Sequence, residues 1–123
     1  MIKKSNIIIT GTSSGIGKAL AIKLLKNDNK VWGCSRKDDL IKNKNYFHSK
    51  LDLSNSVQTN EWITKVSRQT RGKINIFISN AGIFERKLNS LDSLKNISET
   101  IGTNLVAPIL ITNMLSKYMI QNK

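Results

Sequence analysis

Residues 7–17 read IIITGTSSGIG, and this stretch restricts the fold of the chain more than any other. Residues 6–10 are typical of a short apolar strand, and the helical pattern KALAIKLL follows the glycines at once. A strand that runs through a glycine turn into a helix is the start of a βαβ unit. Such a turn directs backbone N–H groups and the positive end of a helix dipole at one point. The stretch therefore predicts a parallel sheet with an anion-binding turn at its edge.

Apolar runs alternate with helical patterns along the rest of the chain. Strands are predicted over residues 6–10, 30–35, 46–52 and 74–79, and helices over residues 15–27, 55–70 and 98–120. This alternation, with strands apolar on both faces, indicates a parallel sheet covered by helices on both sides. Right-handed crossovers favour an α/β, Rossmann-like, doubly wound sheet of order 3-2-1-4 that stops after the fourth strand and its following helices. Residues 1–123 are expected to form one partial nucleotide-binding domain.

The helical patterns also predict which side chains face the sheet. The first helix is expected to present Ile16, Ala19, Leu20 and Leu24, and the second, with Ser54 as its N-cap and Gly72 after its end, Val57, Trp62, Ile63 and Val66. The third helix, with a mild kink at Pro108, carries Ile101, Leu105, Ile109 and Leu115 on one side and Val106, Leu110 and Met114 on another. Because one contact cannot bury that much apolar surface, we expect the third helix to seek a partner.

Composition narrows the class of protein. The net charge is +12, but the lysines are scattered and no basic run is interleaved with aromatic residues, so nucleic-acid binding is not expected. No apolar run is long enough to span a membrane or to serve as a signal-peptide core, and we expect a cytoplasmic protein. The single cysteine, Cys34, excludes an internal disulfide and is expected to be buried. His48 is interpreted as an ordinary strand residue, and no metal site is predicted.

The spacing of Gly11, Gly15 and Gly17 differs from both G-x-G-x-x-G and a P-loop, since Ala19 follows Lys18. Residues 10–17, TGTSSGIG, resemble the cofactor motif of the short-chain dehydrogenase/reductase family. The resemblance implies a cofactor-binding turn made of Gly11, Thr12, Ser13, Ser14, Gly15, Ile16 and Gly17. A turn that only connects two elements is the alternative.

Three further matches follow in the family's order. Asp52 and Leu53 stand where the family contacts the adenine, although Asp52 is also a candidate cap for the next helix. Asn80, Ala81 and Gly82 match an Asn-Ala-Gly motif after the fourth strand, with Ser79 where the family usually has another Asn; Asn80 is alternatively a turn residue. Asn104 falls where the family keeps a helix asparagine of its catalytic set. The resemblance covers essentially the whole chain.

The end of the second strand bears on the cofactor. A carboxylate there binds the ribose 2′-hydroxyl of NAD, whereas an arginine accommodates the 2′-phosphate of NADP. Here Ser35 stands near the position of the acid, and Arg36 and Lys37 follow it, so NADP is favoured over NAD. The alternative is that both cations are solvated surface charges, with Asp38 and Asp39 near enough to compete for them.

The resemblance implies hydride transfer between nicotinamide and a small-molecule carbonyl or alcohol substrate. The family's catalytic Ser and its Tyr-x-x-x-Lys pair lie beyond the helix that carries Asn104, and Tyr118 and Lys123 are five residues apart rather than four. We therefore expect an NADP-preferring reductase fragment that is inactive by itself and associates with a copy of itself through helix 98–120. A non-catalytic nucleotide-binding or interaction module and an inactive truncated remnant remain as alternatives.

Overall fold

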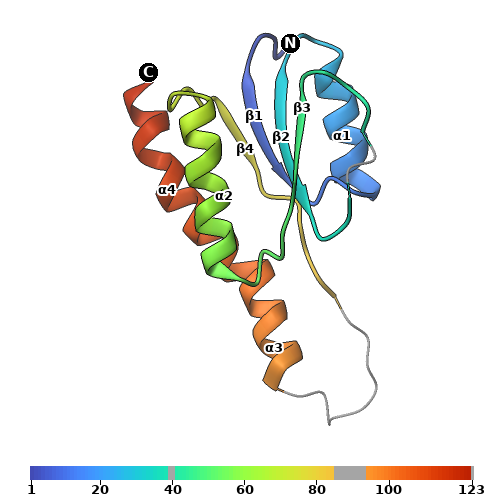
Figure 1. Ribbon diagram of the computed structural model, residues 1–123, viewed down its shortest axis with the longest axis vertical. Coiled ribbons are helices and arrows are strands. Elements are labelled where there is room, and N and C mark those ends of the chain that lie inside the picture. Colours follow the sequence, from blue (N-terminus) through green and yellow to red (C-terminus); the bar gives the residue numbers. More distant parts are fainter. Residues whose placement is uncertain (39–40, 85–93, 123) are drawn as a thin grey trace.

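The computed structural model describes residues 1–38, 41–84 and 94–122. Four parallel strands form one sheet in the order β3-β2-β1-β4 (Figure 1), which confirms the predicted fold and strand order. The strands are β1 (Asn6–Thr10), β2 (Lys30–Ser35), β3 (Tyr46–Lys50) and β4 (Ile76–Ile78). β3 ends two residues earlier than predicted because its last pair is Ser35 with Lys50, where β2 itself ends.

Strand β1 lies at the centre and separates two apolar cores. Ile7, Ile8 and Ile9 are fully buried, and their alternation sends Ile8 to one core and its two neighbours to the other. Helix α1 (Gly15–Leu25) covers one face of the sheet, and helices α2 (Ser56–Gln69) and α4 (Ala107–Gln121) cover the other (Figure 1). This arrangement leaves the turns at the strand ends accessible between the two layers.

The buried face of α1 differs from the prediction. Its buried residues are Gly17, Ala21, Leu24 and Leu25, whereas Ile16 and Ala19 are exposed. The helix begins at Gly15, and close packing of Gly17 on the glycine turn fixes which side faces the sheet. In α2, Trp62, Ile63 and Val66 are buried as predicted, but Val57 is exposed because it lies in the first turn, before the helix reaches the core.

The N-cap of α2 is Asn55, not Ser54. The Asn55 side chain accepts a hydrogen bond from the Gln58 backbone N–H at 3.1 Å. The Ser54 backbone N–H and hydroxyl instead donate to Oδ1 of Asp52, at 2.9 and 2.8 Å. Asp52 thus orders the turn before the helix rather than capping the helix itself.

The last helical segment begins at Leu94 and contains a π turn. Helix α3 (Leu94–Ile101) leads into the π segment η1 (Gly102–Val106) and then α4, with Pro108 in the first turn of α4. The predicted loop at residues 81–90 lies outside the described residues from residue 85 onwards.

The predicted apolar side of this segment is wrong in one respect. Leu115 is buried together with Thr103, Ala107 and Ile111, whereas Ile101, Leu105 and Ile109 are about half exposed. Ile109 and Leu115 both lie in α4, after the π turn, and are six residues apart, which is about 240° around a regular helix, so they lie on different sides of it.

Candidate functional site

A cleft of about 320 Å³ lies at the carboxyl ends of the four strands. In a parallel sheet with helices on both sides, this edge is where ligands bind. The predicted site residues that line the cleft are Gly11, Ser13, Ser14, Arg36, Asp52, Leu53, Asn80, Ala81 and Gly82. The topology therefore brings together residues from four separate stretches of the chain.

The other predicted site residues do not line the cleft. Thr12 is buried under the turn, with 1% of its surface exposed. Gly15, Ile16 and Gly17 form the first turn of α1, and Ile16 is 79% exposed. Asn104 lies in the π segment and is joined to the cleft residue Ile83 by hydrogen bonds.

Gly17 is the tightest point of the glycine turn. A Cβ atom built on Gly17 collides with the carbonyl oxygen of Gly11 and with the side-chain amide of Asn80. Gly11 itself has φ +76° and lies directly against Ala81. Helix α1 and the segment after β4 therefore approach the turn more closely than any side chain at residue 17 would allow.

Asn80 holds the end of β4 to the turn after β1. Its backbone N–H donates to Oγ1 of Thr10 at 3.0 Å, and its Nδ2 donates to the carbonyl oxygens of Thr10 and Gly11, each at 3.1 Å. These bonds give both carbonyl groups of the packed turn a hydrogen-bond partner. Asn80 therefore stabilises the conformation of the glycine turn.

The N-terminus of α1 opens onto this turn. Ser14 precedes the helix in an extended conformation, and among the described residues no side chain caps the first backbone N–H groups. Those N–H groups and the helix dipole make the start of α1 a favourable position for an anion.

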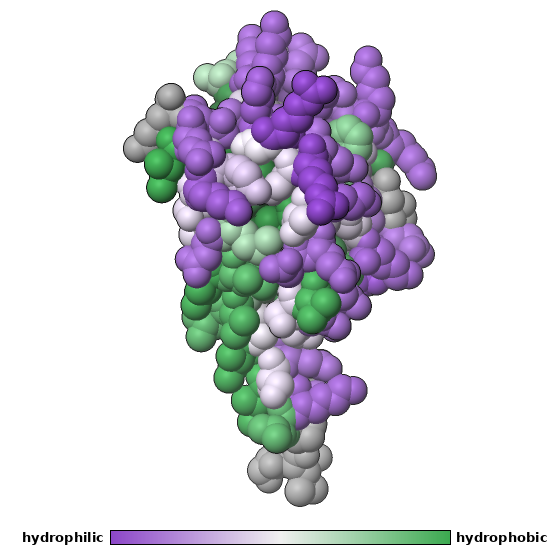
Figure 2. Space-filling view, turned by 60° about the vertical axis from the view of Figure 1, so that its left-hand side comes forward, coloured by the Kyte–Doolittle hydropathy of each residue, from purple (hydrophilic) through white to green (hydrophobic). Residues whose placement is uncertain are grey.

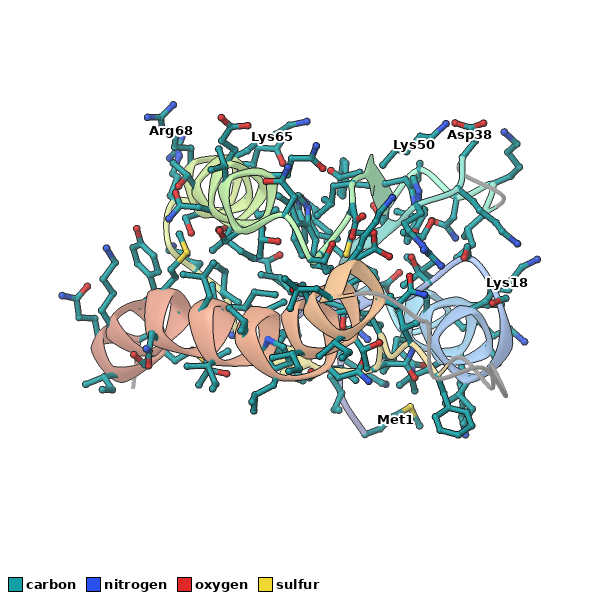
Figure 3. All side chains as sticks on the ribbon, turned by 90° about the horizontal axis from the view of Figure 1, so that it is seen from below. Met1, Lys18, Asp38, Lys50, Lys65 and Arg68 are labelled. Carbon is teal, nitrogen blue, oxygen red and sulfur yellow. The ribbon has the colours of Figure 1, made fainter. Side chains whose placement is uncertain are left out.

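Arg36 and Lys37 form a tight turn at the end of β2. The Ser35 hydroxyl accepts a hydrogen bond from the Lys37 N–H at 3.2 Å and donates to the Lys37 carbonyl at 3.0 Å. Asp38 pairs with Lys50 on β3 at 3.2 Å (Figure 3), so this carboxylate has a partner other than Arg36 and Lys37. Asp39 lies outside the described residues.

Cys34 lines the cleft but is not a nucleophile. Burial raises the pKa of its thiol to about 12, against a smaller lowering by a backbone hydrogen bond from Gly11. The thiol is neutral near pH 7 and buried as predicted, and it contributes packing rather than reactivity.

Asn104 joins the π segment to the chain that leaves β4. Its Oδ1 accepts from the Ile83 N–H and its Nδ2 donates to the Ile83 carbonyl, both at 2.8 Å. The side chain thus pairs with a backbone segment as a neighbouring strand would. π turns often occur at functional sites, because the extra residue redirects a side chain.

Thr103 is a cleft residue that the sequence analysis did not single out. It is 5% exposed, and in the described part of the chain its hydroxyl has no hydrogen-bond partner. A buried hydroxyl without a protein partner, in a residue that lines the cleft, is a candidate contact for a polar ligand. Only its position beside Asn104 signalled it in the sequence.

Comparison with known proteins decides the family. The family model of the short chain dehydrogenases matches residues 5–123, nearly the whole chain. The chain belongs to the short-chain dehydrogenase/reductase family. This membership agrees with the strand order and with the glycine turn, Asp52–Leu53 and Asn80–Gly82, three of the four motifs, which line the cleft at the carboxyl edge of the sheet.

Individual short-chain dehydrogenases support the assignment. A 3-oxoacyl-(acyl-carrier-protein) reductase of Buchnera aphidicola is 32% identical over 99% of this chain and 52% of its own length. The solved structure of 4-hydroxyisoleucine dehydrogenase complexed with NADH matches 95% of this chain and 50% of its own with a TM-score of 0.85 and 26% identity. NADPH-bound carbonyl reductase from chicken fatty liver shares the fold, with 98% of this chain and 53% of its own matched, a TM-score of 0.80 and 23% identity.

The chain spans about half the length of the curated relatives it matches. Among the described residues, no helix is long and apolar enough to cross a membrane. The same part of the chain holds no cluster of three His, Cys, Asp or Glu side chains that would suit a metal ion.

Proposed function

We propose that this chain is the cofactor-binding half of an NADP-preferring reductase that transfers hydride between nicotinamide and a carbonyl or alcohol. The observation that carries the proposal is the shared cleft. One continuous surface joins the glycine turn, Arg36 and Asp52, which are the groups needed for a pyrophosphate, a 2′-phosphate and an adenine. Both an NADH complex and an NADPH complex occur among the structural neighbours, so the preference for NADP rests on Arg36 and Lys37.

The residues present fit a dinucleotide. The turn at Gly11 and the uncapped start of α1 suit the pyrophosphate, because they offer backbone N–H groups without intervening side chains. Arg36 offers a planar fork to a 2′-phosphate, and Lys37 adds a point charge. The unpaired hydroxyl of Thr103 gives a bound dinucleotide a buried polar partner.

The bound nicotinamide would supply the hydride chemistry, and this chain would bind and orient it. Asn104 would hold the Ile83 backbone in place at the edge of the cleft. The family resemblance assigns proton transfer to a Tyr-x-x-x-Lys pair and a Ser outside these residues. We therefore propose that residues 1–123 alone bind cofactor without steady turnover of a carbonyl substrate.

An exposed apolar strip favours association with a second copy. Ile97, Ile101, Leu105 and Ile109 follow one another at four-residue spacing along α3, the π segment and α4, each about half exposed. Figure 2 shows an apolar band along the lower part of this face. We propose that it packs against a second copy of the chain, because an exposed strip of this kind is unusual on a monomer.

The substitution Arg36→Ala tests the cofactor preference. We expect it to weaken NADPH binding about tenfold, since one exposed charge-assisted interaction with a phosphate is lost, and to leave NADH binding nearly unchanged. Arg68→Ala is the matched control, because Arg68 is exposed on α2, away from the cleft (Figure 3). Titration of both nucleotides into each variant measures the effect. Equal loss of NADH and NADPH affinity in Arg36→Ala would contradict the assignment.

A further inference from the structure

A chain of side-chain hydrogen bonds runs beneath the cleft from the glycine turn to the Arg36–Lys37 turn. Thr12 Oγ1 lies 2.6 Å from the Tyr46 hydroxyl, and that hydroxyl lies 2.8 Å from Nδ1 of His48. Nε2 of His48 then lies 2.9 Å from the Lys37 carbonyl oxygen and 3.3 Å from the Ser35 hydroxyl. Neither Tyr46 nor His48 belongs to the motifs that identify the family, and both come from β3.

The partners fix the direction of each hydrogen bond when His48 is neutral. The Lys37 carbonyl only accepts, so Nε2 of His48 carries the proton and donates. Nδ1 is then an acceptor for the Tyr46 hydroxyl, whose oxygen in turn accepts from the Thr12 hydroxyl. Every link therefore has one donor and one acceptor, and the chain ends on the backbone of the Lys37 turn.

Strand β2 leaves space for this series of hydrogen bonds at Gly33. A Cβ atom on Gly33 would collide with both the Tyr46 hydroxyl and the Thr12 hydroxyl. Gly33 pairs with Ile9 on β1 and with His48 on β3. It therefore lies between the two strands that this series of hydrogen bonds connects. Tyr46 is only 7% exposed, which keeps the link from Thr12 to Tyr46 out of water. A glycine inside a strand, where it weakens the sheet, is explained by this close approach.

We propose that Tyr46 and His48 are positioning residues that hold the Arg36–Lys37 turn at a fixed place relative to the glycine turn, and so set discrimination for the 2′-phosphate. The inference rests on the proposed function. A dinucleotide spans both turns at once, so its pyrophosphate and its 2′-phosphate are bound together only if the two turns are correctly spaced. NADH has no 2′-phosphate, so only its pyrophosphate needs one of the two turns, and its binding depends less on the distance between them.

Four substitutions distinguish a role in positioning the Arg36–Lys37 turn from a general effect on the stability of the protein. Tyr46→Phe removes only the hydroxyl, and Tyr118→Phe removes a hydroxyl on α4 as its matched control. His48→Gln places an amide near the position of Nε2 and keeps a donor for the Lys37 carbonyl. His48→Asn is too short to reach that carbonyl and keeps only a partner for Tyr46.

The readout is the ratio of the dissociation constants for NADH and NADPH, obtained by titrating each nucleotide into the protein. We expect Tyr46→Phe and His48→Asn to lower this ratio about threefold to tenfold, through weaker NADPH binding, as loss of one neutral hydrogen bond implies. His48→Gln keeps the bond to the Lys37 carbonyl but loses the one to Tyr46, so it should lower the ratio as Tyr46→Phe does, and Tyr118→Phe should leave the ratio unchanged.

The outcomes distinguish this inference from the proposed function. A wild-type protein that binds neither nucleotide overturns both. A wild-type protein that prefers NADPH, with an unchanged ratio in Tyr46→Phe and His48→Asn, overturns the positioning role alone. Equal weakening of NADH and NADPH in these two variants also overturns it, because that result indicates general destabilisation.

Discussion

The substitution Gly17→Ala should strongly weaken cofactor binding and destabilise the fold. Its new methyl group would collide with the Gly11 carbonyl oxygen and the Asn80 amide. Because a backbone oxygen cannot move aside by a rotamer change, α1 must shift away from the turn or Asn80 must release Thr10 and Gly11. Overpacking of this kind costs about 1–3 kcal/mol, and we expect NADPH affinity to fall about 100-fold or more.

Gly15→Ala is the matched control for stability. Gly15 has φ +56°, so alanine there is strained by about 1–2 kcal/mol, but its Cβ atom meets no neighbour within 4 Å. Chemical denaturation of both variants and titration of Gly17→Ala with NADPH measure the two effects. If Gly17→Ala keeps wild-type stability and affinity, the close packing of α1 on the turn is refuted.

The substitution Ile111→Ala should cost about 2–5 kcal/mol of unfolding free energy. Ile111 is 1% exposed and belongs to the core formed by the sheet, α2 and α4. The unfolding free energy of a domain of this size is small, so a loss of this magnitude leaves a substantial unfolded fraction. The cleft should be lost with the fold, because Thr103 and Asn104 are carried on the same helical segment.

Ile120→Ala provides the control for Ile111→Ala on the same helix. Ile120 is 65% exposed, so its truncation should change the unfolding free energy by less than about 0.5 kcal/mol. Urea denaturation followed by circular dichroism compares the two variants. Similar losses in both would mean that α4 does not pack on the sheet through Ile111.

The fold was predictable from sequence because its signals are local. The apolar run of β1, the glycine turn and the start of α1 are contiguous, and right-handed crossovers restrict the order of the remaining strands. The cleft followed from the same rule, since the ends of parallel strands meet at one edge. Residues as distant as Gly11 and Asn80 were therefore expected to lie together.

Helix faces were less predictable because small offsets change them. Ile109 and Leu115 are six residues apart in α4 and so lie on different sides of that helix, and no local pattern in residues 102–106 signals the π turn before it. The predicted N-cap, Ser54, differs from the observed one, Asn55, because serine and asparagine both cap helices well and the sequence does not separate them. Periodicity fixes the existence of a helix more firmly than its phase.

The Tyr46–His48 chain was not predictable, because its links join residues from three different strands or turns. His48 was interpreted as an ordinary strand residue, and nothing in its neighbours along the sequence indicates Lys37 or Thr12. Gly33 gave a signal, since a glycine inside a strand implies close approach, but the approaching group lies on β3.

Amide chemical-shift mapping with NADPH shows whether one cleft binds a dinucleotide along its whole length. We expect the largest shifts at the glycine turn (11–17), the Arg36–Lys37 turn, Asp52–Leu53 and Asn80–Gly82. NADH should reproduce the shifts at the glycine turn and produce smaller ones at Arg36 and Lys37. No shifts at saturating NADPH, or shifts confined to the outer face of α2 and α4, would contradict the claim.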